Sequence, residues 1–146
     1  MSQRPSSESR SAYRHFSVIQ TRWMDNDVYG HVNNVNYYSY FDTVVNGYLM
    51  TENVLDPKTG PVVGLVVETR CSYLDTLSFP EAVHAGLRVA RIGTSSVHYQ
   101  IGLFRADGDR TVAQGDFVHV YVSRETRRPV QLSDDLKNAL LRLTAD

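Results

Sequence analysis

Residues 25–38 read DNDVYGHVNNVNYY and bring two carboxylates, an imidazole, a glycine and four amides into one short stretch. The polar first part predicts a loop, whereas the aromatic run from Tyr37 opens a strongly apolar segment. A helix that begins near Asn34 would aim its unpaired backbone N–H groups, with their partial positive charge, back at the loop carboxylates. The stretch therefore predicts a candidate base or nucleophile beside a site that stabilises developing negative charge.

The segment from Asn34 to about Met50 predicts a buried helix. Apolar side chains recur at helical spacing on one face and also fill the other faces, which is typical of a helix surrounded by protein. These positions are Tyr37, Phe41, Val44 and Tyr48 on one face and Val35, Tyr38, Tyr40, Val45 and Leu49 on the others. Asn46-Gly47 weakens the last turns and favours an early end of the helix.

Strand-like segments flank this helix, one before it and four after it. They span Tyr13–Trp23, Pro61–Leu74, Glu81–Ile92, Val97–Phe104 and Thr111–Ser123. Gly93-Thr94 and Asp107-Gly108 lie between such segments and favour antiparallel hairpins. Ser133, followed by two aspartates and a leucine stripe, predicts a short capped helix near the end. One buried helix followed by consecutive antiparallel strands indicates an α+β fold.

Length and composition exclude several classes of protein. The chain has 146 residues, which fits one domain with a real core, and a net charge of -1, which gives no field for capturing nucleic acid or an anionic membrane. Cys71 is the only cysteine, which favours a reducing, cytoplasmic setting without disulfides. Residues 1–12 lack the apolar centre of a signal peptide and predict a disordered N-terminal tail, which leaves 13–146 as a single domain.

Three motifs carry a resemblance to a known family. The most specific is residues 27–34, DVYGHVNN, with the aromatic run after it; the others are Ser72-Tyr73-Leu74 with Pro80 downstream, and residues 91–97, RIGTSSV. In this order they make the chain resemble the hot-dog thioesterases, specifically the 4-hydroxybenzoyl-CoA thioesterase-like acyl-CoA thioesterases. The resemblance covers nearly everything from Tyr13 to Leu143. It implies a hot-dog fold, in which an antiparallel sheet of about five strands wraps a long central helix.

The resemblance also implies roles for individual residues. Asp27 takes the position of the catalytic carboxylate, as general base or as nucleophile, and the backbone amide near Asn34 polarises the thioester carbonyl. The residues that would contact the substrate are Gly30, His31, Asn33 and Tyr37. The coenzyme A part of the substrate would meet Arg91, Ser95 and Ser96. No separate cofactor is implied, since coenzyme A belongs to the substrate.

Active sites of this family lie between two subunits, so a homodimer, often paired again into a tetramer, is the implied working unit. The chain departs from the family pattern in the central helix. An acid followed three residues later by arginine is common there, but here the positions hold Asp42 and Val45. What such an arginine does for packing or for the partner surface is therefore in question in this chain.

Other interpretations of the same residues remain open. Asp27 is also well placed to cap the helix or to form an Asx turn, and Asn33 and Asn34 to satisfy backbone groups. His31 fits a supporting role better than that of general base. Asp25, Asp27 and His31 could suggest a metal site, but the chain has no further cluster with ligand spacing, so no metal is expected. The rival functions are a hot-dog dehydratase or hydratase and a catalytically silent acyl-thioester binding protein.

Overall fold

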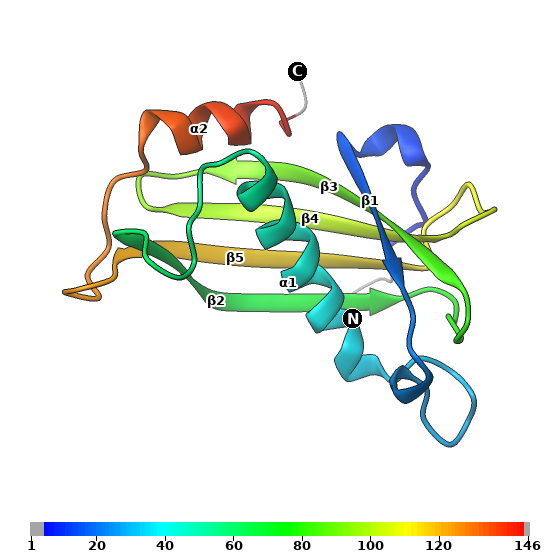
Figure 1. Ribbon diagram of the computed structural model, residues 1–146. Helices are drawn as coiled ribbons and strands as arrows, with labels where there is room; N and C mark the ends of the chain where they lie inside the picture. The colour runs from blue at the N-terminus through cyan, green and yellow to red at the C-terminus, as the bar shows by residue number, and fades with distance from the viewer. Residues whose placement is uncertain (1–4, 145–146) are drawn as a thin grey trace, which may run out of the picture.

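A five-stranded antiparallel sheet wraps around one long helix in the computed structural model, which describes residues 5–144 (Figure 1). The helix, α1, lies across one face of the sheet, and a short helix, α2, packs at one end (Figure 1). The elements in chain order are η1 (Arg10–Ala12), β1 (His15–Gln20), η2 (Trp23–Asp25), α1 (Asn34–Thr51), β2 (Val62–Tyr73), β3 (Ala82–Ile92), β4 (Ser96–Arg105), β5 (Ala113–Ser123) and α2 (Asp134–Leu141). This arrangement confirms the predicted hot-dog architecture.

The strand order is β1-β3-β4-β5-β2, and all neighbouring strands are antiparallel. Both predicted hairpin turns are present: Gly93 N–H donates to the Ser96 carbonyl at 2.8 Å, and Gly108 N–H to the Arg105 carbonyl at 3.0 Å. The 12-residue β2 is an edge strand, and within the described chain its outer edge pairs with no other strand. A bulge interrupts its pairing with β5 between Val66 and Glu68.

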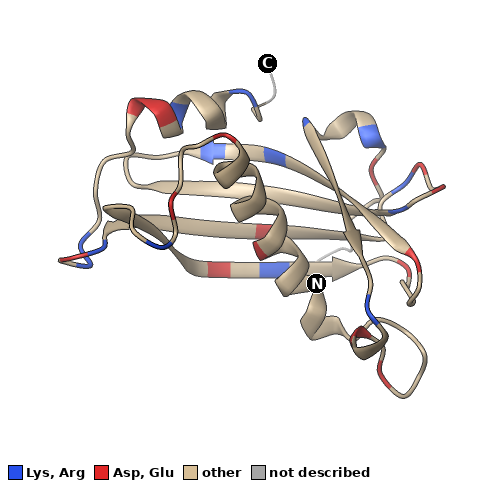
Figure 2. Cartoon of the chain, viewed as in Figure 1, with Lys and Arg blue, Asp and Glu red and all other residues tan. Residues whose placement is uncertain are grey.

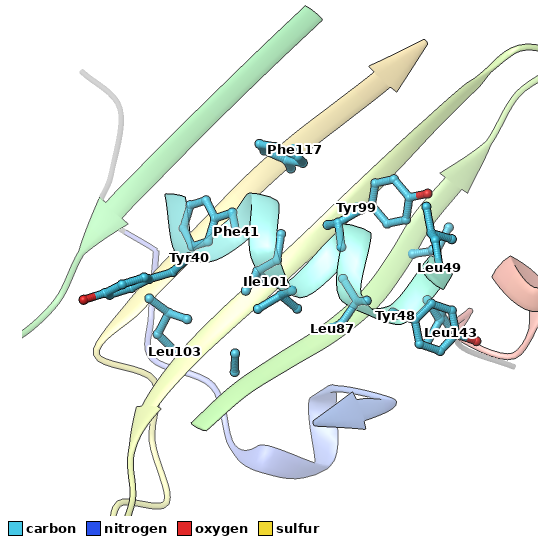
Figure 3. Packing of buried hydrophobic residues seen from close by; sticks show 14 of the residues in the cluster. Tyr40, Phe41, Tyr48, Leu49, Leu87, Tyr99, Ile101, Leu103, Phe117 and Leu143 are labelled. Carbon is cyan, nitrogen blue, oxygen red and sulfur yellow. The ribbon is translucent and has the colours of Figure 1, made fainter. Parts of the chain in front are cut away.

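The helix α1 supplies one side of the core. Its aromatic and aliphatic side chains pack on inward-facing residues of β3, β4 and β5 (Figure 3). Gly115 of β5 allows the ring of Phe41 to pack directly on the strand backbone. A Cβ at this position would lie 2.2 Å from that ring. In keeping with its buried position, α1 has a single charged residue, Asp42, which is exposed (Figure 2).

The predicted helix from Asn34 to about Met50 is confirmed, since α1 runs from Asn34 to Thr51, and the early end that Asn46-Gly47 favours does not occur. Tyr48 and Leu49, which follow the glycine, are 6% and 0% exposed. The Tyr48 hydroxyl also donates a hydrogen bond of 2.7 Å to the backbone carbonyl of Ala139 in α2. Burial of these two side chains outweighs the cost of about 1 kcal/mol that a glycine imposes within a helix.

The expected disorder of residues 1–12 does not hold for Glu8 to Ala12, whereas residues 1–4 lie outside the described part of the chain. Glu8 forms an ion pair of 2.8 Å with Arg88, and Ser9 pairs as a bridge with Arg110. Arg10 donates to two backbone carbonyls of the β4–β5 hairpin, at 2.8 and 2.9 Å. These specific contacts hold the segment against the sheet, although its composition resembles that of a disordered tail.

The N-terminal cap of α2 agrees with the sequence, since the Ser133 hydroxyl accepts a hydrogen bond of 3.2 Å from the Leu136 N–H. Among the described residues, no helix is both long and apolar enough to cross a membrane.

Candidate active site

The loop of residues 26–33 joins η2 to the start of α1 and is built on the buried side chain of Asp25. That carboxylate is 1% exposed. Its Oδ2 accepts hydrogen bonds from the Arg22 backbone N–H at 2.9 Å and from the Tyr40 hydroxyl at 2.8 Å, and its Oδ1 accepts two from the Arg22 guanidinium. Burial alone would raise the pKa of Asp25, but these hydrogen bonds outweigh it and lower the pKa below the ordinary value. Asp25 is thus an ionised structural residue.

The backbone of Asp25 fixes the other end of the loop. Its carbonyl accepts the Asn33 N–H at 2.8 Å and the Asn36 side-chain amide at 3.0 Å. The segment before β3 also contacts the loop, because the Val32 N–H donates to the Leu77 carbonyl at 2.7 Å. The loop is therefore tied to η2, to α1 and to the sheet.

Asp27 lies within this loop and is half-buried. Its Oδ1 accepts the Tyr29 N–H at 2.9 Å, which is the Asx-turn interaction anticipated as an alternative role. Its backbone N–H donates to the His31 carbonyl at 2.9 Å, and Gly30 completes the turn with a φ of +81°. The second carboxylate oxygen has no hydrogen-bond partner within residues 5–144. One oxygen therefore holds the turn, and the other is left free for chemistry.

A cleft of about 400 Å³ lies beside this carboxylate. It is lined by Trp23, Asn26, Asp27, Val28 and Gly30. Asp27 is therefore not sealed inside its turn, and the predicted substrate contact at Gly30 belongs to the same cleft. His31 is exposed next to it, and no carboxylate of the described chain pairs with its ring.

The start of α1 leaves one backbone donor unused. The Asn33 side chain caps the helix by accepting the Val35 N–H at 3.0 Å. The N–H of Asn34, an exposed residue, makes no hydrogen bond to any described residue. The Asn34 carbonyl accepts the hydroxyl of Tyr73 from β2 at 3.2 Å, which fixes the first turn. The free N–H of Asn34 is the amide that the sequence singled out.

Tyr37 does not line the cleft. Its ring is 3% exposed and packs edge-on against Tyr73, with ring centroids 5.0 Å apart. Burial raises the pKa of its hydroxyl to about 12. Within one chain, Tyr37 therefore supports the start of α1 from the core, and its expected contact with substrate finds no support in this placement.

The turn between β3 and β4, next to which Arg91, Ser95 and Ser96 lie in sequence, is at the opposite end of the sheet from the segment between η2 and α1 (Figure 1). The 11-residue β3 begins near the loop of residues 26–33 and ends at the turn that carries these residues, and at roughly 3.3 Å per residue it spans about 35 Å. One chain therefore does not bring the predicted coenzyme A contacts together with the predicted catalytic carboxylate.

Sequence reasoning missed Trp23 as a cleft residue. The first strand was predicted to run through it, whereas β1 ends at Gln20 and Trp23 begins η2. The signal was present, because a large aromatic residue four positions before Asp27 has no apolar periodicity to bury it. Cys71, in contrast, is a partly buried thiol packed against the core, and burial raises its pKa to about 12, which argues against a nucleophile.

A family model described as "Thioesterase-like superfamily" matches residues 21–140. The chain belongs to this superfamily. Membership confirms the resemblance drawn from residues 27–34, and it supports acyl-thioester hydrolysis as the general activity.

Three known proteins illustrate the similarity. The uncharacterized protein YsmA of Bacillus subtilis (strain 168) is 26% identical over 137 residues, which are 94% of this chain and 92% of that protein. The crystal structure of the PA5185 protein of Pseudomonas aeruginosa PAO1 superposes with a TM-score of 0.94 at 48% identity, and the match covers 97% of this chain and 99% of that one. The DHNA-CoA thioesterase of Staphylococcus aureus shares the fold, with a TM-score of 0.78, 18% identity and coverage of 87% and 88%.

No group of three or more histidine, cysteine, aspartate or glutamate side chains in the described chain is arranged to hold a metal ion. The ionisable side chain among the residues that line the cleft is the carboxylate of Asp27.

Proposed function

We propose that this protein is an acyl-CoA thioesterase, in which Asp27 is the general base or nucleophile and the Asn34 N–H polarises the thioester carbonyl. The observation that carries the proposal is a pair of unused groups, one in the loop of residues 26–33 and one on the first residue of α1. Asp27 has one carboxylate oxygen without a partner among the described residues, and the first N–H of α1 is likewise free. A negative oxygen beside a positive helix end is what hydrolysis of a polarised carbonyl requires.

Thioester hydrolysis can proceed with few groups. As general base, Asp27 would take a proton from water while the water oxygen bonds to the carbonyl carbon and the C–S bond breaks. As nucleophile, its oxygen would bond to that carbon, release the thiolate and leave a mixed anhydride that water hydrolyses. In both cases the thiol leaves as thiolate without obligatory protonation, since the pKa of a thiol is roughly 8.5.

Known magnitudes show that this pair of groups is sufficient for useful catalysis. One well-placed donor to the developing oxyanion contributes about 3 kcal/mol, and a positioned base adds about 10²–10⁴-fold in rate. The N-terminus of an 18-residue helix adds its dipole to the single N–H of Asn34.

The working unit we propose is a homodimer, or a tetramer of two such dimers, paired along β2. This long edge strand exposes Leu65, Val66 and Val67 by 40%, 46% and 59%, and an unpaired edge of this kind is a natural surface for antiparallel pairing. Such pairing would bring the beginning of one β2 to the end of the other. The β3–β4 turn lies at the beginning of β2, since Ser96 is opposite Val120 and Val120 is opposite Leu65. Arg91, Ser95 and Ser96 would thereby approach the cleft of the second copy and could bind coenzyme A there.

A dehydratase or hydratase finds less support. Its chemistry uses a histidine and an acid across the site, and His31 has no carboxylate partner in the described chain. The expectation of a cytoplasmic protein rests on the single cysteine and stays part of the proposal.

The test is hydrolysis of a panel of aliphatic and aromatic acyl-CoAs, followed by thiol release, with wild type and Asp27→Asn. Asp42→Asn is the matched control, because Asp42 is an exposed acid within α1 and, among residues 5–144, hydrogen-bonds only to Asn46. We expect turnover by wild type and the control, and a loss of at least about 100-fold in Asp27→Asn. Binding of acyl-CoA without turnover by the wild type would instead identify a silent binding protein.

A further inference from the structure

Trp23 combines high exposure with a fixed position at the mouth of the cleft. Its side chain is 80% exposed, and the neighbouring apolar Val28 is 95% exposed. Large apolar side chains that gather at the surface mark sites of contact with a ligand or a partner more often than chance exposure does. The cleft contains both of these side chains and Asp27, which connects the exposed apolar surface with the proposed chemistry.

The position of Trp23 is set by its backbone turn and by one aromatic contact. The residue belongs to η2, whose geometry is fixed by reciprocal hydrogen bonds between Arg22 and Asp25. The ring of Phe79 meets the indole nearly perpendicularly, at 89°, with centroids 6.0 Å apart. Phe79 is in turn fixed by its N–H, which donates to the Asn26 side chain at 3.0 Å. Because an indole has only two side-chain torsions, an exposed tryptophan on a hydrogen-bonded turn can bind a ligand at little cost in conformational entropy.

The apolar character of Trp23 and Val28 indicates which part of an acyl-CoA would contact them. A group that touches Trp23 in this cleft of about 400 Å³ lies close to the reacting carbon at Asp27, which excludes the nucleotide at the far end of the pantetheine arm. The arm itself carries two amides, and burying an amide without a hydrogen-bond partner costs free energy. The side chains of Trp23 and Val28 offer a single donor, the indole N–H. A hydrocarbon acyl chain can cover these side chains without leaving a polar group unpaired.

We propose that Trp23, supported by Phe79, is the wall against which the acyl group of the thioester lies, and that it makes the site select acyl groups with an extended apolar surface over acetyl. This assignment rests on the proposed thioesterase function and adds a specificity-determining residue to it.

The first test compares kcat/KM for hexanoyl-CoA and acetyl-CoA in wild type, Trp23→Ala and Trp23→Phe. Removal of the indole should lower the hexanoyl-to-acetyl ratio by about 10-fold, because each lost apolar contact discriminates against the longer chain alone. Trp23→Phe should restore most of the ratio. Met50→Ala is the matched control, since Met50 is an apolar residue, 49% exposed, at the other end of α1. Equal losses for both substrates in Trp23→Ala would overturn the assignment.

The second test measures the fluorescence of Trp23 itself. Trp23 is the only tryptophan, so the fluorescence of the protein reports on this site. In the ligand-free protein we expect efficient quenching by iodide. The thioether S-hexyl-CoA should shift the emission to shorter wavelength and protect it from iodide, whereas free coenzyme A should not. The same change with free coenzyme A would assign Trp23 to the pantetheine arm, and shielding without any ligand would assign it to an interface with a second copy; either result overturns the proposal.

The two tests separate this inference from the proposed function. If no acyl-CoA is hydrolysed but S-hexyl-CoA still protects Trp23, only the proposed enzymatic activity fails. If Asp27→Asn abolishes hydrolysis while the fluorescence is unaffected by S-hexyl-CoA and the hexanoyl-to-acetyl ratio is unchanged in Trp23→Ala, only the role of Trp23 fails.

Discussion

His119 should make the folded state lose stability between pH 6.5 and pH 4. Its side chain on β5 is 2% exposed, and it contacts the hydroxyl of Tyr121 through Nδ1 at 3.2 Å. That hydroxyl also shares a hydrogen bond of 2.7 Å with Tyr99, and the Nε2 of His119 has no partner in the described structure. Burial lowers the pKa of His119 from 6.5 to about 4.

The size of the effect follows from the difference in pKa between the unfolded and folded states. Above pH 6.5 the imidazole is neutral in both states, so burial of His119 carries no electrostatic penalty. Below pH 6.5 the unfolded chain gains a proton that the folded chain, with a pKa of about 4, does not accept, and stability falls until the pH drops below both values. At about 1.4 kcal/mol per pH unit, the contribution between pH 7.5 and pH 5 is about 2 kcal/mol.

The assay is urea unfolding of wild type and His119→Leu at pH 7.5 and pH 5. Leucine has a similar volume and no charge, and the Tyr99–Tyr121 hydrogen bond can persist beside it. We expect the free energy of unfolding of wild type to fall by about 2 kcal/mol more than that of His119→Leu over this interval. His31→Gln, which replaces an exposed histidine, should behave as wild type. An equal pH dependence in wild type and His119→Leu would refute the reasoning.

Three further substitutions test how the site and the core are stabilised. Tyr40→Phe removes one of the donors to the buried carboxylate of Asp25 and should lower the free energy of unfolding by about 1.5–3 kcal/mol in urea unfolding; a change below about 0.5 kcal/mol would contradict the role given to this hydrogen bond. Gly115→Ala places a Cβ 2.2 Å from the ring of Phe41 and should cost at least about 1–3 kcal/mol in thermal or urea unfolding. Gly47→Ala, where a Cβ meets nothing within 4 Å in mid-helix, should instead stabilise by about 0.5–1 kcal/mol, and the same sign for both alanines would count against the packing argument.

The fold was predictable where local signals agreed with burial. The apolar periodicity of α1 and the turns at Gly93 and Asp107-Gly108 all correspond to observed elements. Two places where the structure departs from the local signals share one cause. Gly47 and the segment Glu8–Ala12 have weak local preferences, and long-range contacts with α2 and with Arg88 decide their structure. Such contacts leave no periodic trace in the sequence.

The candidate site was predictable only where its residues are close in sequence. Asp27 and Asn34 lie within one eight-residue motif of the sequence, so the motif alone points to both. The cleft wall at Trp23 depends on Phe79, which comes from a segment more than 50 residues later and is brought there by the pairing of β1 with β3. Arg91 lies at the far end of β3, and whether it meets the cleft depends on a second chain, which a single sequence does not place.

The most direct measurement of the central claim is the chemical step itself, followed as thiol release from one acyl-CoA with the protein in excess, for wild type and Asp27→Asn. Under these conditions product release does not limit the rate, and binding of S-hexyl-CoA can be measured separately on both proteins. The account predicts that Asp27→Asn slows the chemical step by about 10²–10⁴-fold while the affinity for S-hexyl-CoA stays within a few-fold of wild type. A chemical step that proceeds at the wild-type rate without the Asp27 carboxylate would contradict it.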